Sequence, residues 1–367
     1  MSDAPKPRRR RKSPARLAAP SLEAAPLRPL GRIRWVLLLL LLTLGLSAGG
    51  FHFWRDYQQF LVTPLLPPGQ QVTILFERGE GLLQLVRHLE QGGVPVGAHW
   101  RWQLLARESK LARRLKAGEY RVDPRLTPPD LLQAIADGRV VMHGLSIEPG
   151  KRFADLRARV EAHPVLVQTL AGADDAEILK AIGATEAHPE GLFLPETYFF
   201  PRGYTDRELY RRAYVSLQKA LDEAWAERRD PLPLKSPYEA LILASIIEKE
   251  TGRAFERPTI AGVFVRRLEL GMRLQTDPTV IYGMGEAFDG NIRRQDLRTD
   301  TPWNTYTRHG LPPTPIALAG RAALKAAVHP AAGRELYFVA KGDGTHQFSE
   351  TLEQHNAAVR KYQLGQE

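Results

Sequence analysis

The sequence contains no cysteine among its 367 residues, which excludes disulfides, thiolate catalysis and cysteine-ligated zinc. It also lacks an H-E-x-x-H pair, a P-loop lysine motif and a G-x-G-x-x-G turn after a strand. Zinc-protease, nucleotide and dinucleotide sites therefore have no support. The absence of cysteine does not identify the compartment, because a chain of this length buries a core without covalent cross-links.

Acidic residues are scarce at the N-terminus, where the positive charge of the chain is concentrated. The whole sequence carries 51 Lys and Arg against 41 Asp and Glu, a net charge of +10. Residues 1–34 hold ten of the basic residues and two of the acidic ones, so the remainder is nearly neutral. This distribution argues against a nucleic-acid-binding groove. Residues 1–32, rich in Pro, Arg and Ala, are predicted to be a disordered basic tail.

Charge is absent between Arg34 and Arg55, where 20 residues dense in leucine contain no Lys, Arg, Asp or Glu. A helix of this length spans about 30 Å, the thickness of a bilayer core. A tryptophan stands at each end, where interfacial aromatics belong. We predict a transmembrane helix over 33–54. By the positive-inside rule the N-terminus is cytoplasmic and everything after residue 55 lies outside.

Two other patterns lie inside this segment. Ser47-Ala-Gly49 offers small residues for cleavage of a signal peptide, but the apolar stretch continues through Phe51–Trp54, which favours an uncleaved anchor. Gly45-Leu-Ser-Ala-Gly49 matches the G-x-S-x-G elbow of serine hydrolases. It has no strand-turn-helix context, so it predicts no hydrolase site.

Past a linker at 55–69, the hydrophobic pattern predicts an α+β chain in two parts. A small α/β unit over 70–147 has strands at 71–76, 118–122 and 140–147 and helices at 81–90, 99–108 and 128–136. Helices dominate the second part, 148–367. They are predicted at 152–162, 174–182, 205–228, 237–251, 254–270, 316–328 and 351–364, with a short strand at 336–339.

One helix of the second part stands out because almost all of its residues are apolar. Ser236 is a favourable N-cap, Pro237 suits the first helical position, and Glu239 completes an S-x-x-E capping box. The run Ala240–Ile247 is apolar except for one serine, which predicts a buried helix.

Glu248 interrupts this run and shares a helical face with residues of it. A carboxyl held against an apolar surface loses hydration of its charged form, which raises its pKa and suits it to general acid catalysis near neutral pH. The alternative is that Glu248 marks the point where the helix meets solvent, since Lys249 and Glu250 follow it.

Polar and aromatic segments separate the helices: Glu190–Tyr198, Leu274–Pro278, Thr301–Tyr306 and Gly310–Pro313. Such loops suit sugar recognition, because aromatic faces stack on sugar rings while amides and carboxylates bind hydroxyls. Each loop alone is more typical of turn chemistry. His346, Glu350 and His355 are of metal-ligating types, but they straddle a predicted loop-to-helix junction. We predict no metal and no cofactor.

Six segments carry a resemblance to a known family: Ala244-Ser-Ile-Ile-Glu-Lys-Glu-Thr251, Gly191-Leu-Phe-Leu-Pro-Glu-Thr-Tyr198, Leu274-Gln-Thr-Asp-Pro278, Asn304-Thr-Tyr306, Gly310-Leu-Pro-Pro313 and Gly342-Asp-Gly-Thr-His-Gln-Phe-Ser349. The chain resembles the endolytic murein transglycosylases, the MltG or YceG-like family, across most of residues 70–362. It departs at Ile147-Glu-Pro-Gly150, where the family has I-P-E-G, and at Thr301-Pro-Trp-Asn-Thr-Tyr306, where it has S-P-Y-N-T-Y.

The resemblance implies a lyase, a lytic transglycosylase, that cuts the MurNAc–GlcNAc bond of nascent peptidoglycan strands and ends their elongation. Glu248 would protonate the glycosidic oxygen and then deprotonate the muramoyl C6 hydroxyl, leaving a 1,6-anhydromuramoyl end. The resemblance also implies a LysM-like glycan-binding module at 70–147, a catalytic domain at 148–367, and peptidoglycan synthases as partners.

We expect six residues to bind glycan around Glu248: Gln275, Asp277, Asn304, Tyr306, Glu196 and Tyr198. Ordinary glycosidases need two carboxyls, whereas an internal hydroxyl nucleophile removes that need. A second carboxylate stays open, with Glu196, Glu250 and Asp277 as candidates. The alternatives are a glycoside hydrolase, which would leave reducing ends, and a non-catalytic peptidoglycan-binding scaffold.

Overall fold

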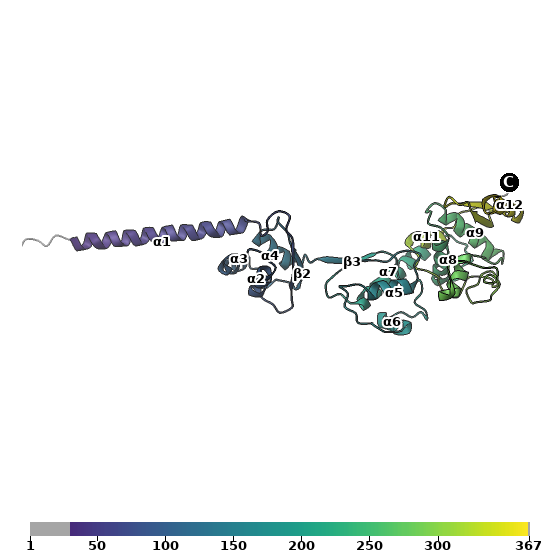
Figure 1. Ribbon diagram of the computed structural model, residues 1–367, viewed down its shortest axis with the longest axis horizontal. Coiled ribbons are helices and arrows are strands. Elements are labelled where there is room, and N and C mark those ends of the chain that lie inside the picture. The colour runs from purple at the N-terminus through teal and green to yellow at the C-terminus, as the bar shows by residue number, and fades with distance from the viewer. Residues whose placement is uncertain (1–29, 366–367) are drawn as a thin grey trace, which may run out of the picture. The chain divides into compact units, whose positions relative to one another are not determined.

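The computed structural model describes residues 30–365 and divides at Thr63–Pro64 into two units (Figure 1). The first contains one helix, α1 (Leu30–Val62). Its leucines from Leu37 to Leu46 are more than half exposed. Within the described residues, this is the one helix long and apolar enough to cross a membrane, a test that a signal sequence also passes. Because α1 continues to Val62, the predicted linker 55–69 is wrong over 55–62.

The second unit begins with the elements that the sequence predicted for the small α/β region. These are β1 (Val72–Phe76), α2 (Leu82–Gln91), α3 (His99–Glu108), β2 (Gly118–Val122) and α4 (Pro128–Asp137). Strands β1 and β2 pair antiparallel. The next strand, β3 (Met142–Ser146), pairs instead with β4 (Thr197–Pro201), so it forms a ribbon with the following region and not a third strand of the first sheet.

Helices dominate the rest of the unit, and the fold is mixed α and β as predicted. The elements are α5 (Phe153–Glu161), α6 (Asp175–Ile182), α7 (Asp206–Ala226), α8 (Pro237–Glu250), α9 (Arg257–Glu269), α10 (Asp277–Met284), η1 (Gly285–Ala287), α11 (Arg321–Val328), β5 (Tyr337–Ala340), β6 (His346–Ser349) and α12 (Leu352–Tyr362). The sequence missed β4, α10 and β6, and the helix predicted over 316–328 begins only at Arg321.

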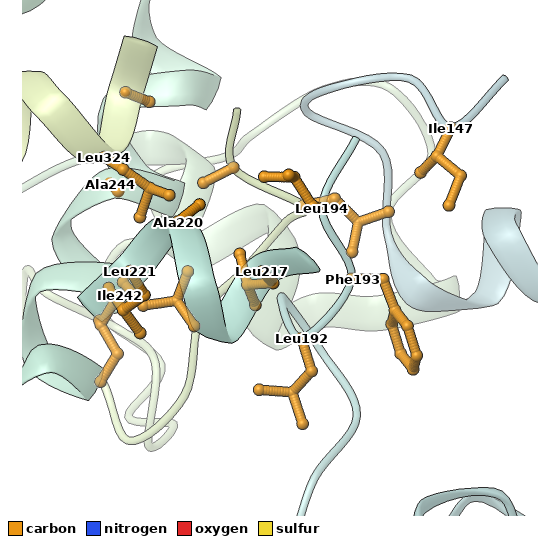
Figure 2. Close-up of a cluster of buried hydrophobic side chains, with 14 of the residues drawn as sticks. Ile147, Leu192, Phe193, Leu194, Leu217, Ala220, Leu221, Ile242, Ala244 and Leu324 are labelled. Carbon is orange, nitrogen blue, oxygen red and sulfur yellow. The ribbon is translucent and has the colours of Figure 1, made fainter. Parts of the chain in front are cut away.

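Helix α8 lies at the centre of the main core, which Figure 2 shows around Leu217, Ala244 and Leu324. Every residue from Ala240 to Ile247 is buried, as the sequence predicted. Burial of each large apolar side chain contributes about 1.5–3 kcal/mol. The Ser236 hydroxyl accepts from the Glu239 N–H, but the Glu239 carboxylate accepts from the Lys235 N–H at 2.6 Å. The reciprocal half of the predicted capping box is therefore wrong.

Candidate active site

Glu248 lies on a face of α8 that another segment covers. Its side chain is 6% exposed; Oε1 accepts from Arg257 Nη2 and Oε2 from the Gly320 N–H, both at 3.0 Å. One turn earlier, the Ser245 hydroxyl accepts from the Ile316 N–H at 3.0 Å. The carboxylate is thus buried as predicted, but its expected apolar surroundings are wrong: a guanidinium and a backbone donor satisfy it.

The covering segment 316–320 is held in place by residues far away in sequence. The Gly150 N–H donates to Leu318 O at 2.9 Å, and the Leu318 N–H donates to Lys151 O at 2.8 Å. These contacts use the backbone groups that a helix would need, which explains why the helix predicted from 316 begins at Arg321. At Gly320, a Cβ atom would lie 3.3 Å from Glu248 Oε2, so glycine permits this close approach.

Glu250 is two residues beyond Glu248, and residues two apart on a helix do not share a face. The Thr276 hydroxyl donates to its carboxylate. Loss of hydration on burial raises the pKa of Glu250 to about 7; the Thr276 hydrogen bond opposes this, and the negative charge of Asp277 adds to it. A carboxyl that titrates near neutrality can both donate and accept a proton there.

The structure brings the loops 274–277 and 304–306 together beside Glu250. The Thr276 N–H donates to the Thr305 hydroxyl at 3.1 Å. The Tyr306 hydroxyl donates to Asp277 Oδ1 at 2.6 Å. Gln275 is exposed, with a φ of +51° that a non-glycine residue rarely adopts. Three of the predicted site residues, Gln275, Asp277 and Tyr306, therefore gather around Thr276, the partner of Glu250 and not of Glu248.

Asn304 is 1% exposed, and its side-chain amide makes hydrogen bonds within its own loop. Its amide nitrogen donates to Thr299 O at 2.7 Å, among other carbonyls, and its amide oxygen accepts from the Tyr306 N–H at 2.8 Å. The Asn304 amide is thus used within its own loop, and the proposal below does not assign it to the glycan. Turn chemistry, the alternative left open for this loop, therefore accounts for Asn304, and it orients Tyr306.

Glu196 and Tyr198 lie elsewhere. Tyr198 is buried in β4, where its hydroxyl donates to Leu194 O at 2.8 Å and burial raises its pKa to about 12. Glu196 is exposed and pairs with Arg321 at 2.9 Å. Tyr198 thus packs in the core, and the proposal below does not assign it to the glycan. The contacts of Glu196 do not connect it to the residues around Glu250.

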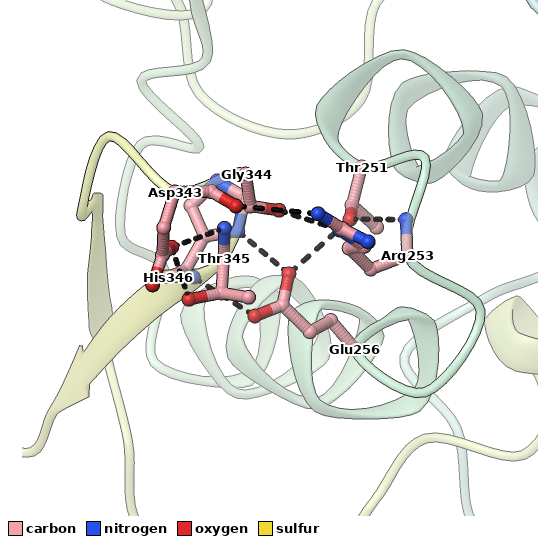
Figure 3. Close-up of polar contacts among 7 residues, drawn as sticks. All are labelled: Thr251, Arg253, Glu256, Asp343, Gly344, Thr345 and His346. Carbon is pink, nitrogen blue, oxygen red and sulfur yellow. Dashed lines mark hydrogen bonds and ion pairs between the residues drawn. The ribbon is translucent and has the colours of Figure 1, made fainter.

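A cluster of hydrogen bonds between residues 251–256 and 343–346 fixes the turn after Glu250 (Figure 3), and the sequence did not predict it. Glu256 accepts from the N–H and Nδ1 of His346, both at 2.8 Å, and from the Thr251 hydroxyl at 3.2 Å. Arg253 donates to Asp343 O and Gly344 O. His346, weighed as a metal ligand, pairs with Glu256, while His355 stacks on Tyr337. The G-D-G-T-H run was visible in the sequence, but its partner was not.

Comparison with known proteins agrees with these motifs. The model of the YceG-like family matches residues 74–361. The chain is 40% identical over 176 residues to the endolytic murein transglycosylase of Bacillus subtilis, covering 48% of each chain. It is 25% identical over 363 residues to that of Streptococcus pneumoniae, covering 86% of this chain and 63% of the relative.

The chain therefore spans about half to two thirds of the length of these curated relatives. A crystal structure of a yceG-like protein from Listeria monocytogenes is 28% identical, with a TM-score of 0.49 over 78% of this chain and 99% of that one. Because the family model covers most of its residues, this chain belongs to the YceG-like family.

Proposed function

We propose that this protein is a lytic transglycosylase that cuts peptidoglycan strands. The proposal rests mainly on Glu250, whose carboxyl has a pKa of about 7 and lies where two polar loops meet. The names of the relatives, endolytic murein transglycosylases, supply the substrate class. The expected bond is the one between MurNAc and GlcNAc of nascent strands, so that cutting ends strand elongation.

The catalytic role moves from Glu248 to Glu250 in this proposal. Glu248 is bound to Arg257 and the Gly320 N–H on a covered face, as expected of an ion pair that holds α8 to α9. Glu250 has what a general acid needs: a carboxyl protonated for a large fraction of the time near pH 7, and neighbours able to orient a sugar.

The reaction follows from one carboxyl acting twice. The Glu250 carboxyl donates its proton to the glycosidic oxygen as the bond from muramoyl C1 to that oxygen breaks. The carboxylate then removes the proton of the muramoyl C6 hydroxyl as its oxygen bonds to C1. Glu250 ends protonated, water is not consumed, and a 1,6-anhydro end forms. A single carboxyl suffices because the nucleophile belongs to the substrate.

Three residues are assigned to orienting the glycan. Tyr306 lies beside Asp277 through its hydrogen bond, and the exposed Gln275, with its strained backbone, lies in the loop that leads to Asp277. A strained backbone persists only where its surroundings enforce it, which is common at binding sites. Asp277 has a second effect, because its negative charge contributes to the raised pKa of Glu250.

Product analysis tests this function. Purified protein is incubated with peptidoglycan sacculi, and the soluble fragments are analysed by mass spectrometry, with Glu250→Gln protein as the matched blank. The proposal expects internal 1,6-anhydromuramoyl ends, each 18 Da lighter than a hydrolytic end by the water it lacks. Reducing ends would establish a glycoside hydrolase, and absence of any cleavage by an intact, folded chain would establish a binding scaffold.

The domain organisation forms part of the proposal. The N-terminal helix would anchor the chain in the inner membrane, with residues 1–32 in the cytoplasm and the catalytic part from about 148 in the periplasm. Peptidoglycan synthases at that surface would be its partners. The length and apolar composition of α1 support the anchor. Cell fractionation with N-terminal sequencing tests it, since a soluble chain starting near Gly49 would indicate a cleaved signal peptide.

Residues 70–147 would form a LysM-like glycan-binding module. The order β1, α2, α3, β2, with the two strands paired antiparallel, supports this assignment. Inactive full-length protein carrying Glu250→Gln should bind insoluble peptidoglycan. A chain starting at Met142 and carrying the same substitution should bind more weakly, whereas equal binding would remove the module from the account.

A further inference from the structure

Glu190 is a second buried carboxyl, outside the residues assigned above. It is 4% exposed, and its Oε1 accepts from the N–H of Phe153, the first residue of α5, at 3.0 Å. The Gly191 N–H, the Tyr282 hydroxyl and the Arg152 guanidinium lie close enough to act on its charge. Burial raises the pKa of Glu190 to about 7, against the effect of these partners. A buried carboxyl with so many donors holds several segments together.

One of these segments is α10. Tyr282 lies in that helix, and the Arg152 guanidinium lies 5.2 Å from the centre of its ring. Arg152 Nη2 also donates to Ile281 O at 3.1 Å. Arg152, which faces Glu190, therefore contacts the C-terminal half of α10. The first residue of this helix is Asp277.

The backbone at Glu190 is itself held tightly. Gly191 has a φ of +79°, and a Cβ atom there would lie 2.4 Å from Pro315 Cβ. Gly191 therefore packs closely against Pro315. The next residue, Ile316, donates its N–H to the Ser245 hydroxyl of α8. The carboxyl of Glu190 consequently projects from a rigid point of the core toward a short helix.

We propose that Glu190 is a positioning residue of the glycan site, which holds α10 so that Asp277 stays beside Glu250. This inference rests on the proposed function. A helix of eight residues is too short to be stable by itself, so its position depends on tertiary contacts. At one end of α10, Ile281 and Tyr282 contact Arg152, which faces Glu190; at the other end, Asp277 accepts from the Tyr306 hydroxyl.

The charged and titratable groups facing Glu190 come from three elements. Arg152 precedes α5, Tyr282 belongs to α10, and His188 lies in the loop of Glu190, where its Nδ1 accepts from the Glu190 N–H at 3.2 Å. Replacing the carboxyl by an amide removes the acid group that Arg152 and Tyr282 both face. We therefore expect α10 to loosen and Asp277 to act less strongly on Glu250.

The test compares Glu190→Gln with Asp206→Asn. Asp206 is an equally buried acid, 2% exposed, that accepts from the N–H groups of Thr169 and Leu170 and so holds a different loop. Glu190→Gln should lower kcat about ten- to a hundredfold, because small misplacements of catalytic groups cost that much. It should also move the alkaline limb of the pH–rate profile to lower pH, because Asp277 would no longer raise the pKa of Glu250 as strongly.

Asp206→Asn should leave the position of that limb unchanged. Tyr282→Phe, which deletes only one hydroxyl, should shift it in the same direction as Glu190→Gln but by less. An unchanged limb in folded Glu190→Gln protein would overturn the proposal. An equal shift in Asp206→Asn would do the same, because it would reveal a general effect of destabilisation.

Hydrogen exchange gives a readout that does not depend on activity. Glu190→Gln should speed amide exchange in residues 277–284, whereas Asp206→Asn should speed it in residues 167–170. If the wild type leaves no anhydro ends but α10 loosens in Glu190→Gln, the proposed function fails and the anchoring of α10 stands. Unchanged exchange in α10 would overturn the anchoring itself.

Discussion

The last turn of α8 carries two glutamates in opposite situations. Glu248 faces the segment 316–320, where Arg257 and the Gly320 N–H satisfy its charge. Glu250 faces Thr276 and the charge of Asp277, and its pKa rises to about 7. Both are withdrawn from water. Their different partners make one suited to fastening the fold and the other suited to carrying a proton.

The comparison teaches that burial alone does not identify a catalytic acid. A buried carboxylate with a guanidinium partner is stabilised as an anion, and removing either partner leaves an uncompensated charge. A buried carboxyl such as that of Glu250, with a hydroxyl donor and a neighbouring carboxylate, favours the protonated form even though His346 acts in the opposite direction. The groups that face a buried carboxyl decide whether it is suited to proton transfer.

The largest expected effect is on catalysis. Glu250→Gln keeps the volume of the side chain but cannot transfer a proton, so kcat/KM should fall about 10²–10⁴-fold. Glu248→Gln should cost less activity in the protein that remains folded. Release of anhydro ends measures both. The opposite order, with Glu248→Gln the more damaging, would return the catalytic role to Glu248.

The next largest effect is on stability, where Glu248→Gln should be more damaging than Glu250→Gln. Glu248→Gln leaves the largely buried Arg257 without its counter-ion, which should lower the free energy of unfolding by about 3 kcal/mol. Glu250→Gln should cost little or even stabilise at pH 8, because it removes a carboxyl that is costly to ionise. Urea unfolding measures both. A stable Glu248→Gln variant would show that the ion pair does not fasten α8.

Stability should also depend on pH through Glu250 and Glu190. Their folded pKa values, about 7, lie above the ordinary value of 4.5, so the folded state binds protons more tightly than the unfolded state. Their stabilising contribution is complete below about pH 4.5 and is lost as the pH rises to 7. Each carboxyl accounts for up to about 3 kcal/mol, at about 1.4 kcal/mol per pKa unit.

Urea unfolding at several pH values measures this loss. In Glu250→Gln and Glu190→Gln, part of the decline between pH 4.5 and 7 should disappear. If the free energy of unfolding declines as much in both variants as in the wild type, other groups cause the decline.

The smallest expected effect separates the charge of Asp277 from its hydrogen bond. Asp277→Asn removes a negative charge that raises the pKa of Glu250, so the alkaline limb of the pH–rate profile should move to lower pH by less than about one unit. Asp300→Asn is the matched control, because Asp300 is exposed and pairs with Arg308. A shift of the limb to higher pH in Asp277→Asn would contradict the proposed coupling.

Local signals in the sequence predicted much of the fold. Apolar periodicity and the cap at Ser236 located most helices, including α8. Helix α10 was missed because it has only eight residues and begins with Asp277-Pro278, which resembles a turn. Residues 316–320 were predicted as helix because they are apolar, whereas their backbone bonds go to Gly150, Lys151 and Ser245.

The candidate site shows the same limit of local signals. The sequence identified the helix and the loops at Gln275–Asp277 and Tyr306, and these do meet. It did not reveal which glutamate they meet, because the neighbours of each face of α8 come from distant segments. Asn304 and Tyr198 have residue types suited to sugar binding, but tertiary packing uses their polar groups internally.

The most direct test is the titration of the Glu250 carboxyl itself. Protein labelled with ¹³C at the glutamate carboxyl carbon is followed by NMR from pH 3 to pH 9, and the Glu250 signal is assigned by its loss in Glu250→Gln. The account predicts a midpoint for Glu250 near pH 7. A midpoint below pH 5 would contradict the claim that Glu250 holds the catalytic proton.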